Sequence, residues 1–258
     1  MKELDPRLVA AFLTERTNII FPPGGDTFED TYLENYQVEN VMTTLGMCLG
    51  EIHKVEGYGY GLINSDKFAI GELVGRHSCW SNFILDNTKS RFDQMKSVLE
   101  QEEINDKHIT ELSDDKRKLM MNLLGRSKDV LSILEKEKKL MDDAPSSLLY
   151  GNVHLGNIVV DDGKLVGLRD FEQPLIGDPV DDLAYFSVMP EGEKYLSFVL
   201  NGWKEVINDP DLDKKLHLYR LIESYRKIYT RYINHHSLQD YSEPLSIAQK
   251  ELRYYNIS

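Results

Sequence analysis

Cysteine is nearly absent from this sequence, with only Cys48 and Cys79 among 258 residues. Two cysteines cannot build the disulfide framework of a small secreted domain or supply a structural zinc site, so both are expected to be buried free thiols. Long apolar runs are also missing: the run Ile158–Val160 is typical of the longest ones, whereas a membrane-spanning helix needs about 20 residues. The first six residues are acidic and end in a proline, unlike a signal peptide. These absences predict a cytoplasmic protein with no membrane segment.

Basic residues are outnumbered, with 30 Lys and Arg against 43 Asp and Glu and a net charge of −13. This excess of negative charge disfavours polyanionic partners, so neither a nucleic acid nor an anionic membrane surface is expected as a partner. The apolar fraction of 41% and the charged fraction of 28% are ordinary for a globular chain, which excludes disorder as the main state. The length fits one large domain or two unequal lobes.

Apolar residues recur every three or four positions over most of the chain, which predicts helices. A first helix is expected over residues 6–16, before a loop with two prolines and two glycines at 22–25. A second helix is expected between residues 32 and 55, ahead of a glycine-rich turn at 57–61. Further helices are expected across residues 80–139, interrupted by a polar stretch at 101–115, and then at 183–188, 195–207, 216–233 and 245–255.

One segment clearly predicts strands. Residues 158–160 and 165–168 are apolar and are separated by Asp161, Asp162 and Gly163, residue types that favour a tight hairpin turn. The turn geometry explains these two carboxylates better than a cation site does. With helices before and after one central hairpin, the sequence predicts an α+β fold dominated by helix.

Asparagine, glycine and acidic residues cluster around this hairpin. Asn152, His154 and Asn157 precede the first strand, and Asp170 follows the second. Phosphoryl transfer from a nucleotide needs a group that orients the attacking hydroxyl and hard oxygen ligands that hold Mg²⁺. We expect Asn157 and Asp170 to converge at one end of the hairpin and to offer an amide oxygen and a carboxylate to a metal ion.

The whole pattern resembles the catalytic segment of the aminoglycoside phosphotransferase and choline kinase superfamily. The matching residues are Gly151, His154, Gly156, Asn157, Asp170, Phe171 and Glu172, followed by Gly177-Asp178-Pro179 and Asp182-Leu183-Ala184. Residues 45–53 are similar to the first helix of the family's C-terminal lobe, and the resemblance extends over residues 36–258. It implies a protein-kinase-like fold with two lobes, ATP or GTP with Mg²⁺ as cofactors, and phosphorylation of a hydroxyl on a small-molecule acceptor.

The resemblance also implies roles for single residues. Asn157 and Asp170 would bind the metal and the nucleotide phosphates. His154, in the same loop, is a candidate catalytic residue, or else it holds the shape of the loop through a backbone hydrogen bond. Asn152 holds the position of the family's catalytic aspartate. Glu172 would lie on the substrate side, and Asp178 and Asp182 would be either structural or substrate-side residues.

Two departures from the family pattern bear on activity. The amide of Asn152 can hydrogen-bond a hydroxyl but cannot take its proton, and general-base catalysis is worth on the order of 10²- to 10⁴-fold. Only residues 1–35 precede the first helix of the C-terminal lobe, and Lys2 is their single lysine. The sequence therefore predicts a reduced N-terminal lobe segment at 1–35 and a helical C-terminal lobe at 36–258.

Three hypotheses follow. The first is a catalytically impaired pseudokinase that acts by binding a ligand or a partner. The second is an active ATP- or GTP-dependent phosphotransferase that uses Mg²⁺. The third is that a protein partner covers the reduced N-terminal lobe. For the acceptor, a group of acidic residues would suit a cationic ligand or would be ordinary surface acidity; these residues are Asp178, Asp181, Asp182, Glu191 and Glu193.

Overall fold

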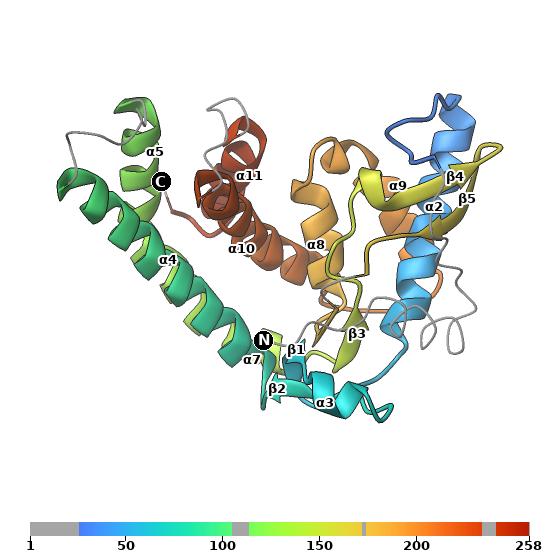
Figure 1. Ribbon diagram of the computed structural model, residues 1–258, viewed down its shortest axis with the longest axis horizontal. Helices are drawn as coiled ribbons and strands as arrows, with labels where there is room; N and C mark the ends of the chain where they lie inside the picture. Colours follow the sequence, from blue (N-terminus) through green and yellow to red (C-terminus); the bar gives the residue numbers. More distant parts are fainter. Residues whose placement is uncertain (1–25, 105–113, 172–173, 234–240, 258) are drawn as a thin grey trace.

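The computed structural model describes residues 26–104, 114–171, 174–233 and 241–257. Within these ranges the fold consists of helices around two small antiparallel sheets (Figure 1). The α+β class expected from the sequence is confirmed. The helix expected over residues 6–16 lies outside the described residues, as does most of the predicted N-terminal segment.

A four-stranded sheet that the sequence did not predict lies in the lower part of Figure 1. Its strands, in the order β2-β1-β6-β3, are Gly75–His77, Tyr60–Ile63, Leu175–Gly177 and Ser147–Leu149. The short helix α3 (Ser65–Phe68) connects β1 to β2. The expected glycine-rich turn thus runs directly into β1, a central strand. Strands of three or four residues carry too little alternation to stand out from a sequence.

The predicted hairpin is formed by β4 (Ile158–Asp161) and β5 (Lys164–Leu168), which pair antiparallel. Asp162 and Gly163 have φ values of +46° and +70°, as a tight turn between twisted strands requires. The other edge of β4 is covered by the segment that leads into the first described helix, because the amide of Phe28 donates to the carbonyl of Ile158 at 2.9 Å. The short 3₁₀ helix η1 (Leu155–Asn157) enters the hairpin.

The helices follow the predicted pattern closely. Before the hairpin they are α2 (Asn35–His53), α4 (Trp80–Ile104), α5 (Asp114–Gly125), α6 (Ser127–Lys136) and α7 (Lys138–Asp142). After it they are α8 (Val180–Val188), α9 (Gly192–Lys204), α10 (Leu212–Ile233) and α11 (Ser242–Tyr254). Helix α2 packs against α9, and α10 packs against α8 and α11. None of the helices in the described ranges is both long and apolar enough to cross a bilayer.

Helices α2 and α9 cross unusually closely. A Cβ atom added at Gly46 would lie 2.0 Å from the carbonyl oxygen of Val199, and one added at Gly202 would lie 1.8 Å from that of Thr43. Both positions therefore require glycine, which lets the two backbones touch. This contact anchors α2 beside the hairpin.

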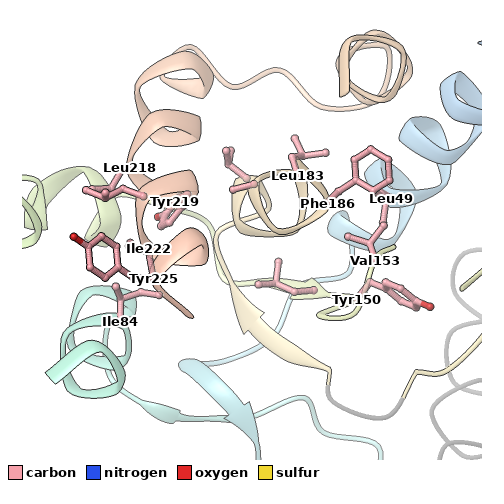
Figure 2. Close-up of a cluster of buried hydrophobic side chains, with 14 of the residues drawn as sticks. Leu49, Ile84, Tyr150, Val153, Leu183, Phe186, Leu218, Tyr219, Ile222 and Tyr225 are labelled. Atoms are coloured by element: carbon pink, nitrogen blue, oxygen red, sulfur yellow. The ribbon is translucent and has the colours of Figure 1, made fainter. Parts of the chain in front are cut away.

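The core joins the helices to the loop between β3 and β4 (Figure 2). Leu49 of α2 and Phe186 of α8 lie beside Tyr150 and Val153 of that loop, and Ile84 of α4 and Tyr219 of α10 belong to the opposite side of the same cluster. Tyr150 and Val153 are fully buried, so the loop is fixed to the core on one side. The two cysteines are free, as expected, but both are only half-buried.

Candidate functional site

The loop between β3 and β4 brings together the three residues on which the sequence prediction depends. The Nδ2 atom of Asn152 donates to Oδ2 of Asp170 at 2.9 Å, and Nδ2 of Asn157 donates to the backbone carbonyl of Asn152 at 2.9 Å. Asn157 and Asp170 therefore flank Asn152 at the open end of the hairpin. Both are hydrogen-bonded to Asn152 although 13 positions separate them in the chain.

Asp170 has a left-handed backbone with φ = +64°. A non-glycine residue in this region costs on the order of 1–3 kcal/mol and persists where the surroundings impose it. Here the carbonyl of the preceding residue, Arg169, accepts a hydrogen bond from the buried hydroxyl of Tyr150. The Arg169 Nε atom donates to the carbonyl of Gly156 at 3.0 Å. These bonds hold the end of β5 so that the Asp170 carboxylate is exposed beside the loop.

Oxygen atoms of Asn157 and Asp170 suit a hard cation. The amide nitrogen of Asn157 is committed to the Asn152 carbonyl, which leaves its Oδ1 as an acceptor, and Asp170 keeps Oδ1 free of the bond to Asn152. Mg²⁺ is typically held by one or two protein oxygens together with water and substrate phosphates. The donor set therefore fits Mg²⁺, which would offset phosphate charge at this position.

Asp182, on α8, binds the backbone of the loop between β3 and β4. Its carboxylate accepts hydrogen bonds from the backbone amides of Tyr150 at 2.7 Å and Gly151 at 2.8 Å. It also pairs with Nε2 of His53 at 3.0 Å. The indole N–H of Trp203 donates to Nδ1 of His53 at 2.9 Å, and a ring nitrogen that accepts leaves the proton on the other one. His53 therefore donates to Asp182, and α2, α8 and α9 share one buried clamp on the loop.

The comparisons with known proteins agree with this geometry. The sequence model described as the phosphotransferase enzyme family, APH, matches residues 23–214. The chain belongs to this family. The resemblance inferred from the motif residues is thereby confirmed, and so is the kinase-like fold class. No curated protein sequence matches the chain.

Solved structures of other phosphotransferases share the fold. A thermostable mutant of aminoglycoside phosphotransferase APH(4)-Ia, in a ternary complex with AMP-PNP and hygromycin B, is 15% identical over 89% of this chain and 69% of that chain, with a TM-score of 0.59. ADP-bound aminoglycoside phosphotransferase APH(2'')-Ib is 15% identical over 95% and 82%, with a TM-score of 0.58. Macrolide 2'-phosphotransferase MphH from Brachybacterium faecium is 13% identical over 94% and 78%, with a TM-score of 0.52.

Asp178 lies in the interior of this family member. It is 0% exposed and 3.1 Å from the ammonium of Lys215, and it accepts a hydrogen bond from the Tyr219 hydroxyl at 2.9 Å. Burial raises the pKa of Asp178, while Lys215 lowers it. Asp182 is 1% exposed. Of the two alternatives left open for Asp178 and Asp182, the structure favours the structural role, because neither carboxylate reaches an open surface. Glu172 lies outside the described residues.

The acidic residues that would suit a cationic acceptor are either buried or paired with cations. Asp181 is also buried, like Asp178 and Asp182. Glu191 pairs with Lys194, and Glu193 pairs with Arg220 and Lys250. The sequence could not indicate this burial, because the direction in which each α8 carboxylate points depends on how the helix is docked.

Cationic and aromatic residues flank the loop instead. The hydroxyl of Tyr185 donates to Oδ1 of Asn152 at 3.3 Å, and the guanidinium of Arg226 lies 4.6 Å from the centre of the Tyr185 ring. Burial lowers the pKa of His154, with Lys227 and Arg169 acting in the same direction and Glu29 and Asp170 opposing. The half-buried His154 therefore favours its neutral form. No local motif marks Tyr185, because it reaches Asn152 only through the packing of α8 beneath the loop.

Proposed function

We propose that this chain is a small-molecule-binding member of the phosphotransferase enzyme family in which phosphoryl transfer is impaired. One observation carries the proposal. Both polar atoms of the Asn152 side chain are committed, Nδ2 to Asp170 and Oδ1 to Tyr185. An amide that holds these bonds can position a hydroxyl beside it but cannot accept its proton.

The expected loss is large. General-base catalysis contributes on the order of 10²- to 10⁴-fold, while typical kinases turn over at about 1–100 s⁻¹. Removal of the base alone would therefore leave about 1 s⁻¹ at most. The nucleotide is proposed to be ATP or GTP, held through Mg²⁺ on Asn157 and Asp170. This step is supported by relatives that bind AMP-PNP or ADP and by the oxygen donors of these two residues.

The division into a reduced N-terminal lobe segment at 1–35 and a helical C-terminal lobe at 36–258 forms part of the same proposal. It is supported by the described part of the segment, which lies against the C-terminal lobe. Thr27 forms a β-bridge with Val159, and the Phe28 ring packs edge-on against Tyr195 at 5.5 Å.

The second candidate is an active ATP- or GTP-dependent phosphotransferase acting on a small-molecule hydroxyl. The paired oxygen donors of Asn157 and Asp170 favour it, because they suit the Mg²⁺ that phosphoryl transfer requires. In that case the metal ion and the fixed loop would provide the rate enhancement, and Asn152 would only orient the acceptor hydroxyl.

The test combines nucleotide binding with turnover. Full-length protein is titrated with AMP-PNP and with a GTP analogue, with and without Mg²⁺, and the release of ADP from ATP is followed in parallel. We expect Mg²⁺-dependent binding that Asp170→Asn abolishes, ADP release below about 1 s⁻¹, and at least a ten-fold increase in Asn152→Asp.

Asp162→Asn is the matched control. It makes the same carboxylate-to-amide change on the exposed turn of the same hairpin, at a left-handed position that asparagine tolerates, so binding should be unchanged. ADP release by the unmodified chain at the rate of an ordinary kinase would refute the proposal that phosphoryl transfer is impaired and would support the second candidate. If neither the unmodified chain nor Asn152→Asp binds nucleotide, the nucleotide site assumed by both candidate functions is refuted.

A further inference from the structure

A cluster of cationic side chains lies beside the candidate site in a chain whose net charge is −13. Helix α10 contributes Arg226, Lys227 and Arg231, and helix α4 contributes Arg91, which lies close enough to Arg226 for the two charges to repel. The carboxylates that face this cluster are Glu223 of α10, Asp181 of α8 and Glu243 of α11. Four cations against three carboxylates leave an excess of positive charge there.

Lys227 has only a weak hydrogen-bond acceptor beside it among the described residues. Its Nζ atom lies 3.1 Å from the thioether sulfur of Met189, which is a weak acceptor. It forms no ion pair with any residue that the structure describes. Burial, Arg231 and Arg226 together lower the pKa of Lys227 to about 8, while Glu223 opposes them. A half-buried ammonium in this setting gains more from an incoming anion than an exposed lysine does, because much of its hydration is already lost.

The cluster flanks the position where an acceptor hydroxyl would lie. Arg226 covers the ring of Tyr185 at 4.6 Å, and the Tyr185 hydroxyl is bonded to Asn152. Lys227 is close enough to His154 of the loop to lower its pKa. Arg226 is already paired with Glu223, to which its Nε donates at 2.6 Å. It therefore lends positive charge, while Lys227 remains available to a ligand.

Building on the proposed function, we propose that the acceptor carries an anionic group, a phosphate monoester or a carboxylate, which Lys227 binds beside Arg226 while a hydroxyl of the same molecule lies at Asn152. The ligand would supply the counter-charge that Lys227 lacks. This class differs from the cationic acceptor that the acidic sequence composition suggested. The charge of the Lys227 cluster is opposite in sign to the charge of the whole chain.

The test is calorimetric titration of the full chain with glycerol 3-phosphate and with glycerate, which pair a hydroxyl with a phosphate monoester and with a carboxylate. Kanamycin serves as the cationic comparison. We expect at least one of the two anions to bind at millimolar concentration. Lys227→Met should weaken that binding about ten- to hundred-fold, the effect of losing a charge-assisted hydrogen bond. Binding should also weaken as the pH rises through about 8.

Lys204→Met is the matched control, because Lys204 is an exposed lysine on α9 and its loss should leave binding unchanged. Circular dichroism and the melting temperature show whether Lys227→Met is folded, and Lys227→Gln replaces it if it is not. Equal binding by the Lys227 variants, no binding of either anion, or binding of kanamycin alone would each overturn the proposal. If the Lys227 variants lose only Mg²⁺–AMP-PNP binding, the proposal is overturned as well, because Lys227 would then bind the nucleotide. High ADP release with intact anion binding would refute only the impaired activity.

Discussion

The buried clamp on the loop gives the sharpest test of the structure. Replacing Asp182 with asparagine keeps the size of the side chain but turns one of its oxygens into an NH₂ donor. The carboxylate accepts from the amides of Tyr150 and Gly151 and from Nε2 of His53, so the variant leaves one buried donor without an acceptor. It also removes the charge from the other two bonds.

The magnitude follows from these three bonds. An unsatisfied buried donor costs about 1–3 kcal/mol, and a bond to a neutral acceptor is about 1 kcal/mol weaker than one to a charged acceptor. The free energy of unfolding should therefore fall by about 3–5 kcal/mol in Asp182→Asn, a large part of the 5–15 kcal/mol typical of a native protein. Urea denaturation followed by circular dichroism measures this change, with the slope unchanged if only stability is affected.

The neighbouring residue provides the control. Asp181 is also buried, and its Oδ1 has no hydrogen-bond partner among the described residues. Burial and the nearby Glu223 raise its pKa well above 3.8. A carboxyl whose pKa is higher in the folded state stabilises the fold less as the pH rises, so Asp181→Asn should be neutral or stabilising, and more favourable at neutral than at acidic pH. If Asp181→Asn and Asp182→Asn destabilise equally, the clamp is not the cause.

Two further predictions concern packing and buried charge. Gly46→Ala should destabilise the protein by about 1–3 kcal/mol, because the new methyl group meets a carbonyl of α9. Gly125→Ala, where nothing lies within 4 Å of the added methyl group, should instead stabilise it by up to about 1 kcal/mol. Chemical denaturation of both variants measures these changes, and equal effects would contradict the close crossing of α2 and α9. Lys215→Met removes the cation from the fully buried Asp178 and should cost about 3–5 kcal/mol. Since burial already raises the pKa of Asp178, this loss should grow as the pH rises past that raised pKa, and a loss independent of pH would show that Asp178 stays protonated.

Features encoded within a short stretch of chain were predictable from the sequence. In the helices after the hairpin, apolar residues recur with the period of a helix face. Asp162 and Gly163 indicate the turn by their residue types. The convergence of Asn157 and Asp170 was predictable for the same reason, since a single hairpin joins them. The family resemblance rests on this local segment as well.

Short strands and charge directions were not predictable. Strands β1 and β3 belong to one sheet although more than 80 residues separate them, and neither is long enough to show a period. The acidic run at the start of α8 looks like surface charge in the sequence. Asp178, Asp181 and Asp182 are nevertheless buried, since α2, α9 and α10 pack around them.

The sequence by itself determined the helical periods, the hairpin and the set of polar residues around it, because each depends on residues near one another in the chain. Only the tertiary structure decided what those residues do. Docking of α8 and α10 beneath the loop brings Tyr185 to Asn152 and Arg226 to Tyr185, and it leaves Lys227 beside a thioether. The charge that faces the site is therefore set by helix packing, which composition and spacing do not specify.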